Sequence, residues 1–396
     1  MRVSKTNASV IFALAVVHFT GDFFSSFIIP LLPVFVDSFS LSLTQAGIVT
    51  GVSRILAFIV QPFVGYLADR HQSRVFVLGG LSLVVLFVPL TGVAPGYATL
   101  LVLIALGSIG SSMFHPTCAG MVPDYAGTKP GLAMSLFNMG GTLSFGVGPV
   151  FITWYVGAFG MKAMPWTMGL GILVLVLLLR ILPPPRGEGL RNLGFLGSMR
   201  DAFGDVWKPI MVLWIIMVMR SFAGQSFITF MPVLFVREGF SLVSVGTLVS
   251  MFTVAGAVSG IVAGHLSDRL GFKKIFYVTH GLATPAFLSM LYVPGYWVHL
   301  FSFFAGFFAL ATLPLCVLMA QEMAPRGKSM VSSLMMGLAF GTGGMLTPLT
   351  GMMADLFAIR PVLTAVAVVP LLTVGLIPLL PERRTTPGLN APLSTT

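Results

Sequence analysis

Gly65-Tyr66-Leu67-Ala68-Asp69-Arg70 is a short polar stretch between two long apolar runs, and it recurs as Gly264-His265-Leu266-Ser267-Asp268-Arg269. The two copies lie 199 residues apart and share the pattern Gly-x-Leu-x-Asp-Arg. The same offset relates two pairs of prolines: Pro33 with Pro232, and Pro149 with Pro348. Repetition at a fixed offset indicates that one structural unit occurs twice in a chain. The sequence therefore predicts two related halves, each with a polar turn at the matching place.

The composition indicates a membrane protein. Of the 396 residues, 56% are hydrophobic and only 9% are charged, whereas soluble domains carry roughly 25% charged residues. Apolar runs of about 20 residues recur along the whole chain, and this is the length that an α-helix needs to cross a bilayer. The runs do not alternate as the strands of a membrane barrel do. We therefore expect an all-α polytopic membrane protein.

We expect twelve transmembrane helices in two pseudo-symmetric six-helix bundles. The expected spans are 9–36, 45–67, 75–93, 97–122, 130–158 and 164–182, followed by 209–236, 243–266, 274–293, 296–320, 328–354 and 359–380. The expected domains are an N-terminal bundle (1–182), a cytoplasmic linker (183–208), a C-terminal bundle (209–380) and a cytoplasmic tail (381–396). Apolar residues at helical spacing predict an amphipathic helix on the membrane surface within the linker, and an irregular linker is the alternative.

The net charge of +10 is explained by the placement of the basic residues. Of the 22 Lys and Arg residues, 17 fall in the terminal segments and loops on one side, and three (Lys162, Arg237 and Arg360) fall on the other. The positive-inside rule then places both termini in the cytoplasm of a bacterial inner membrane protein. A nucleic-acid partner is not needed to explain the charge.

Five ionisable residues stand out inside the expected spans. Asp22 lies near the middle of the first span, and His18 precedes it by four residues and so shares its helix face. Arg54 and Arg220 lie in the second and seventh spans, and His115 lies in the fourth. A charge at the bilayer centre costs at least ~2.5–3.5 kcal/mol, so each of these residues is a candidate for function.

The repeat suggests a pairing among these residues. With the offset of 199, Gly21 matches Arg220 and Asp22 matches Ser221, so acid and base occupy similar depths in related helices. We expect an ion pair between Asp22 and Arg220 across a central cavity, broken when Asp22 takes up a proton with the help of His18. A static ion pair that only fixes the packing is the alternative.

The remaining candidates concern the substrate. Arginine cannot release a proton in the physiological range, so Arg54 and Arg220 are expected to hold an anionic group. Phe23, Phe145, Phe227 and Asn138 are expected to line the substrate site. For His115, which precedes Pro116, we leave two roles open: proton or substrate handling, or a hydrogen bond to backbone that the proline leaves free.

The repeated polar turns have a structural role of their own. Asp69 and Asp268 follow the inner ends of the second and eighth expected spans, where a carboxylate can cap a neighbouring helix. Arg70, Arg74 and Arg269 stand next to them and can pair with acids or lipid headgroups. One such motif alone is a weak signal, but its repetition in a twelve-span chain is specific.

With these features the sequence resembles the major facilitator superfamily over essentially the whole chain. The resemblance implies that superfamily's fold and a rocker-switch transport cycle of alternating access. It also implies a cytoplasmic gate, here Gly65, Asp69, Arg70 and Arg74 with Gly264, Asp268 and Arg269. A finer resemblance is to the fosmidomycin-resistance group of drug exporters. It is carried by three stretches: His18-Phe19-Thr20-Gly21-Asp22, Phe114-His115-Pro116, and Met134-Ser135-Leu136-Phe137 with Gly140-Gly141.

We therefore expect a proton-coupled secondary transporter, an antiporter that exports small amphipathic or anionic compounds including drugs. The alternative is a proton-coupled importer of an organic anion. An intramembrane enzyme is disfavoured, because the sequence has no His-Glu-x-x-His pattern and only two cysteines. We expect no cofactor and no metal. The expected partners are the substrate, protons and membrane lipids, and the protein is expected to be a monomer.

Overall fold

The computed structural model describes residues 7–68, 73–127, 130–182, 206–323, 335 and 340–381, and the regular elements in these ranges are all helical. The first half contains α1 (Ala8–Ser25), α2 (Leu32–Phe39), α3 (Leu43–Ala68), α4 (Ser73–Leu90), α5 (Tyr97–Tyr125), α6 (Pro130–Phe159) and α7 (Met168–Ile181). The second half contains α9 (Trp207–Arg237), α10 (Leu242–Leu270), α11 (Phe272–Tyr292), α12 (Trp297–Leu310), α13 (Leu313–Met323), α15 (Phe340–Met345), α16 (Thr347–Phe357), α17 (Ile359–Ala367) and α18 (Val369–Val374). The predicted all-helical class is confirmed.

Ten helical segments of the described residues are long and apolar enough to cross a membrane, which identifies a multi-pass membrane protein. The ninth and eleventh expected spans are not among these ten. Residues 324–334 and 336–339, which include much of the eleventh expected span, lie outside the described residues. The count of twelve spans therefore stays a prediction.

Prolines divide three of the expected spans. The first, expected as 9–36, is split between α1 and α2, with Pro30 in the break and Pro33 in the first turn of α2. The tenth is split between α12 and α13 just before Pro314, and the last is split between α17 and α18 just before Pro370. The helices are interrupted at these points because proline lacks the N–H that an interior helix position donates. The tenth and last expected spans are nevertheless each found as one apolar segment of membrane-spanning length, Trp297–Met323 and Ile359–Leu379.

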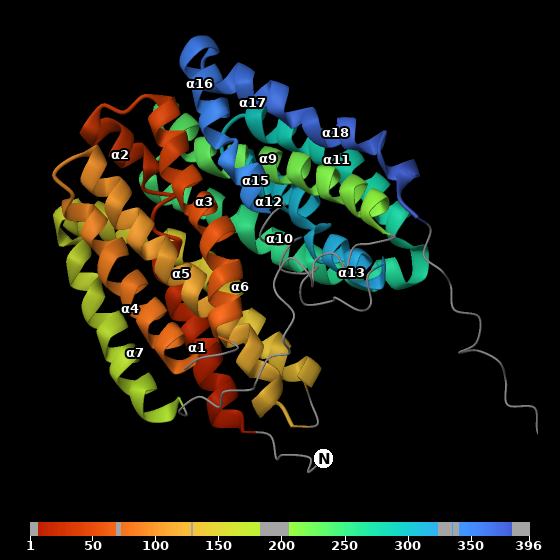
Figure 1. Cartoon of the computed structure of the whole chain (residues 1–396). Helices are drawn as coiled ribbons and strands as arrows, with labels where there is room; N and C mark the ends of the chain where they lie inside the picture. The colour runs from red at the N-terminus through yellow and green to blue at the C-terminus, as the bar shows by residue number, and fades with distance from the viewer. Residues whose placement is uncertain are drawn as a thin grey trace, which may run out of the picture.

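The helices of each half pack mainly on one another. In the first half α1 packs against α5 and α6, and α4 packs against α5; in the second half α12 packs against α10 and α11. The two halves touch where α3 meets α15 and α16 and where α6 meets α10 (Figure 1). These contacts between the halves determine how the site on α1 can communicate with the second half.

Candidate functional site

α1 and α5 bring three ionisable side chains together inside the first half. The Nε2 atom of His18 lies 3.2 Å from Oδ2 of Asp22, and the Nε2 atom of His115 lies 3.0 Å from Oδ1 of the same carboxylate. His18 and Asp22 stand one helical turn apart on α1, as their spacing predicts. Each carboxylate oxygen of Asp22 therefore faces one histidine.

Backbone carbonyls determine which histidine nitrogens carry a proton. The Nδ1 atom of His18 lies 2.9 Å from the carbonyl oxygen of Phe137 in α6, and the Nδ1 atom of His115 lies 2.8 Å from that of Ser111. A carbonyl oxygen can only accept, so both Nδ1 atoms donate. In the neutral form each Nε2 would then turn a lone pair toward a carboxylate oxygen. A proton or another cation between Asp22 and each histidine removes this repulsion.

The three side chains differ in their access to solvent. The side chain of Asp22 is 6% exposed, that of His18 is 11% exposed, and that of His115 is 28% exposed. His115 is thus the member of the group that the rest of the protein covers least. Of the two roles left open for His115, the structure shows both a backbone hydrogen bond, to Ser111, and direct contact with Asp22.

The site depends on a missing side chain at Gly141 in α6. A β-carbon there would lie 2.5 Å from Nε2 of His18 and 3.0 Å from Oδ2 of Asp22. Gly140, its neighbour, lies equally close to α1, against the carbonyl oxygen of Ala15. The pair of glycines lets the backbone of α6 approach α1 closely, as small residues do between membrane helices.

Gly141→Ala is expected to displace His18 from Asp22 and to reduce transport strongly without unfolding the protein. Gly157→Ala in the same helix is the matched control, since a β-carbon there meets nothing within 4 Å. Transport assays and thermal unfolding of both purified variants give the two measurements. Equal transport by the Gly141 and Gly157 variants would contradict the assigned role of the His18–Asp22 contact.

The expected Asp22–Arg220 ion pair is not formed. Arg220 is 1% exposed in α9, and its Nη1 donates to the carbonyl oxygen of Ala309 at 2.6 Å. Its Nε and Nη2 atoms have no hydrogen-bond partner among the described residues. The prediction failed because similar depth along two helices does not determine the directions in which their side chains point. Arg220 points into the second half, whereas Asp22 is already paired with two histidines.

Arg54 is an arginine that interacts with Asp22 electrostatically. Its guanidinium, on α3, is close enough to interact electrostatically with the Asp22 carboxylate. The stem of Arg54 lies against α15 of the second half, where a β-carbon on Gly344 would overlap its Cγ atom. Arg54 therefore connects the charge of the site to a helix of the other half.

The other expected substrate residues fall in different surroundings. Phe23 is buried on α1 and packs on Phe151 at 5.1 Å between ring centroids. Phe145 on α6 is half-buried, and its carbonyl oxygen accepts a hydrogen bond from Thr253 in α10. Asn138 is exposed on α6. Phe227 is fully buried in the second half and stacks on Phe287 at 3.9 Å, so it belongs to the core rather than to an open site.

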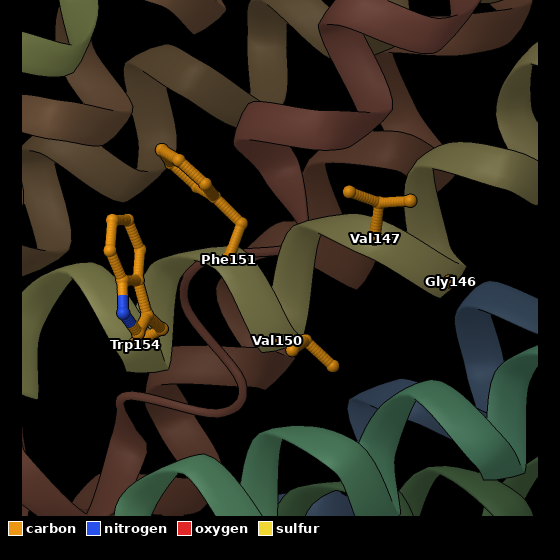
Figure 2. Close-up of a pocket in the computed structure, with 5 residues that line it drawn as sticks. All are labelled: Gly146, Val147, Val150, Phe151 and Trp154. Carbon is orange, nitrogen blue, oxygen red and sulfur yellow. The ribbon is translucent and has the colours of Figure 1, made fainter.

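An apolar pocket of about 420 Å³ lies along α6. Its lining consists of Gly146, Val147, Val150, Phe151 and Trp154, which follow one another along the helix (Figure 2). The contact between Phe151 and Phe23 places this pocket next to the helix that carries Asp22. The pocket offers apolar surface beside α1.

The expected gate residues are described only in part. Asp69 and Arg70 lie outside the described residues, Gly65 lies near the end of α3, and Gly264 and Asp268 lie in the last turns of α10. Arg269 is exposed in the last turn of α10. Arg74 donates to the carbonyl oxygen of Leu179 and so ties α4 to the end of α7.

The histidine–aspartate group also has the composition of a metal site. One ligand atom from each of His18, Asp22 and His115 lies within 4.8 Å of the other two. Histidines whose Nδ1 atoms donate to carbonyls are typical of transition-metal ligands. Experiments on this site therefore need a chelator to separate protons from metal ions.

Sequence reasoning missed Asp355. This residue, on α16, accepts hydrogen bonds from the backbone N–H groups of Leu43 and Thr44 at the start of α3. The signal that was available is the sequence Ser42-Leu43-Thr44-Gln45, a capping box that locates a helix N-terminus. That an acid from the other half would reach this terminus could not be read from the sequence.

Apolar helices of membrane-spanning length around a buried ionisable group define a multi-pass membrane transporter. A family model, "Major Facilitator Superfamily", matches residues 14–348, and the chain belongs to that superfamily. This confirms the resemblance that the repeated polar turn suggested, and it places the chain among transporters rather than enzymes.

Curated relatives and solved structures agree with this assignment. The chain is 25% identical over 382 residues to the fosmidomycin resistance protein of Escherichia coli (strain K12), covering 93% of this chain and 92% of that protein. It is 25% identical over 302 residues to the multidrug resistance protein MdtG of Enterobacter lignolyticus (strain SCF1), covering 70% and 69%. A bacterial homologue of the human lysosomal transporter Spinster, solved in an inward-facing and occupied conformation, matches with a TM-score of 0.80 at 18% identity, covering 95% of this chain and 97% of that one.

Proposed function

We propose that the protein is a proton-coupled antiporter that works by alternating access and exports small amphipathic or anionic compounds, including drugs. One observation carries the proposal: the buried Asp22 carboxylate lies between the Nε2 atoms of two histidines, an arrangement that can take up and release protons. The relatives named for fosmidomycin and multidrug resistance support export of drugs as the task.

The proposed architecture is the one that the repeat predicts. Twelve spans form two pseudo-symmetric bundles, 1–182 and 209–380, joined by a cytoplasmic linker and followed by a cytoplasmic tail. The bias of basic residues to one side supports cytoplasmic termini in a bacterial inner membrane. In this orientation the site on α1 lies between the two membrane faces, and the protein acts as a monomer among lipids.

The coupling step is an exchange of charge partners at Asp22. With protons on the histidine contacts, the positive charge beside Asp22 weakens the hold of that carboxylate on Arg54. Without those protons, Arg54 is the remaining cation, and it draws α3 and the neighbouring α15 toward α1. Protonation thereby biases the contact between the halves, which is what a coupled transporter needs.

The substrate is proposed to bind beside this group. The apolar pocket on α6, with Phe23 and Phe145 near it, receives the apolar part, and Asn138 provides a polar contact. Arg220 and Arg54 attract an anionic group. The polar turns, Gly65, Asp69, Arg70 and Arg74 with Gly264, Asp268 and Arg269, are proposed to close the cytoplasmic side when the outer side opens.

Proteoliposomes with an imposed pH gradient test the proposal. The panel consists of anionic and amphipathic drugs, with EDTA present so that metal ions cannot occupy the histidine group. We expect substrate to move uphill against the proton flow, and to stop moving when an ionophore removes the gradient. Transport in the same direction as the protons would indicate the importer instead. A transport rate that does not change with the pH gradient would refute proton coupling.

A further inference from the structure

Asp355 joins the two halves at the end of the molecule where α3 begins. Its Oδ1 accepts from the backbone N–H of Leu43 at 2.7 Å, and its Oδ2 accepts from the backbone N–H and the hydroxyl of Thr44 at 2.9 and 2.6 Å. The residues are more than 300 positions apart in the sequence, so these contacts link the second half to the first. Among the described residues, the backbone N–H groups of Leu43 and Thr44 find their acceptor in the second half and not in the first.

The hydrogen bonds at the start of α3 show why an acid is needed there. The N–H of Ala46 donates to the carbonyl of Ser42, which closes the first helical turn. The N–H of Gln45 donates to the Ser42 hydroxyl, and the Gln45 side chain accepts from the Ser42 N–H. The N–H groups of Leu43 and Thr44 remain, and a helix N-terminus attracts negative charge. Asp355 satisfies both of them.

The packing below this contact is tight and includes further polar links. The Thr50 hydroxyl of α3 lies 3.2 Å from the hydroxyls of both Thr347 and Thr229 in the second half. A β-carbon on Gly47 would lie 2.7 Å from the Thr347 carbonyl oxygen, and one on Gly351 would overlap the Leu43 carbonyl oxygen. The start of α3 and the helix α16 therefore touch backbone to backbone.

The repeat shows that this link exists in one half only. With the offset of 199, Leu43 and Thr44 correspond to Leu242 and Val243, at the start of α10, and Asp355 corresponds to Val156 on α6. Gly47 and Pro348 do keep their counterparts, Gly246 and Pro149, which pack together in the same way. The packing is thus repeated, whereas the carboxylate is an addition at the α3–α16 crossing.

We propose that Asp355, with the N-terminus of α3, is the latch that holds the outer side of the transporter closed. The inference rests on alternating access as proposed above, and on the charge bias that places the start of α3 on the outer side. To open outward, α16 must leave α3, and the N–H groups of Leu43 and Thr44 then lose their acceptor. The latch therefore favours the inward-facing state. Opening to the outside requires that substrate binding from the cytoplasm offset the loss of these hydrogen bonds.

The latch does not depend on the same protons as the site on α1. Partial burial raises the pKa of the Asp355 carboxyl, but the hydrogen bonds from Thr44 and Leu43 lower it more, and the pKa lies below the ordinary value. Asp355 is therefore ionised at neutral pH and stays ionised under moderate acidification. Arg360 and Glu238 pair with each other rather than with Asp355.

Spin labels on Ser38→Cys and Leu356→Cys measure the latch directly, in a background without Cys118 and Cys316. Both label sites are exposed, one at the end of α2 and one beside Asp355. A long distance between the two labels reports the state that is open to the outside. Asp355→Ala is expected to raise the population of this state at least about tenfold, because charge-assisted hydrogen bonds are lost. Thr44→Val, the residue found at the matching position of α10, is expected to have a smaller effect in the same direction.

Asp37→Asn is the matched control, since it removes an exposed acid near the same end of α2 and is expected to leave the distances unchanged. Identical distance distributions in the wild type, Asp355→Ala and Thr44→Val would overturn the latch. The spin labels report the distance between the two halves and do not depend on proton coupling. Their result is therefore independent of the pH-gradient experiment. A protein that fails that experiment can still show the latch.

Discussion

Asp22→Asn is expected to reduce uphill transport driven by a pH gradient to the level of vesicles without protein. Asparagine has the size of aspartate and can still accept a hydrogen bond from one histidine, but it cannot bind and release a proton near neutral pH. Exchange of substrate across the membrane without a gradient is expected to continue, because substrate binding does not need the charge of Asp22. Initial rates of both processes in the same proteoliposomes give the measurement.

One further variant tests the role of a neighbour of Asp22, and another serves as its control. His115→Gln is expected to slow coupled transport, since His115 contacts the Asp22 carboxylate and is the more exposed of the two histidines, which suits the proposed transfer of a proton. Asp37→Asn, which removes an exposed acid remote from the site in the sequence, is expected to behave as wild type. Full uphill transport by Asp22→Asn would remove Asp22 from the coupling role.

Arg220→Met is expected to weaken the transport of anionic substrates about 10- to 100-fold, the effect of losing hydrogen bonds to a charged group worth ~1.5–3 kcal/mol. The thermal stability of the purified protein is expected to stay the same or to rise. The physical reason is that Arg220 is fully buried and that its Nε and Nη2 have no hydrogen-bond partners among the described residues, and burying an unpaired charged group is costly.

Arg237→Met provides the comparison for Arg220, because it removes an arginine from the exposed last turn of the same helix. Neutral amphipathic substrates are expected to be transported equally by both variants and the wild type. If Arg220 only holds α9 against α12 through the Ala309 carbonyl, Arg220→Met will instead lower the melting temperature and affect all substrates alike. That pattern would remove Arg220 from the substrate site.

Local spacing predicted the centre of the site, and tertiary packing supplied its partners. His18 and Asp22 are four residues apart on one helix, so their contact follows from helix geometry alone. His115 could be selected as an ionisable residue in a membrane span, but its distance to Asp22 depends on how α5 is rotated against α1. The pairing of Asp22 with Arg220 was wrong for the same reason, since the repeat predicts depth and leaves the rotation of each helix open.

The sequence by itself determined the all-helical membrane class of the protein and its internal repeat, because apolar length and charge bias follow directly from transfer into a bilayer. It also identified the residues that are costly to bury. Only the tertiary structure decided that Asp22 faces two histidines, that Arg220 points into its own half, and that Asp355 caps a helix of the other half. Such contacts depend on close approach between helix backbones at glycines such as Gly141 and Gly47, and a linear pattern of residues does not contain that geometry.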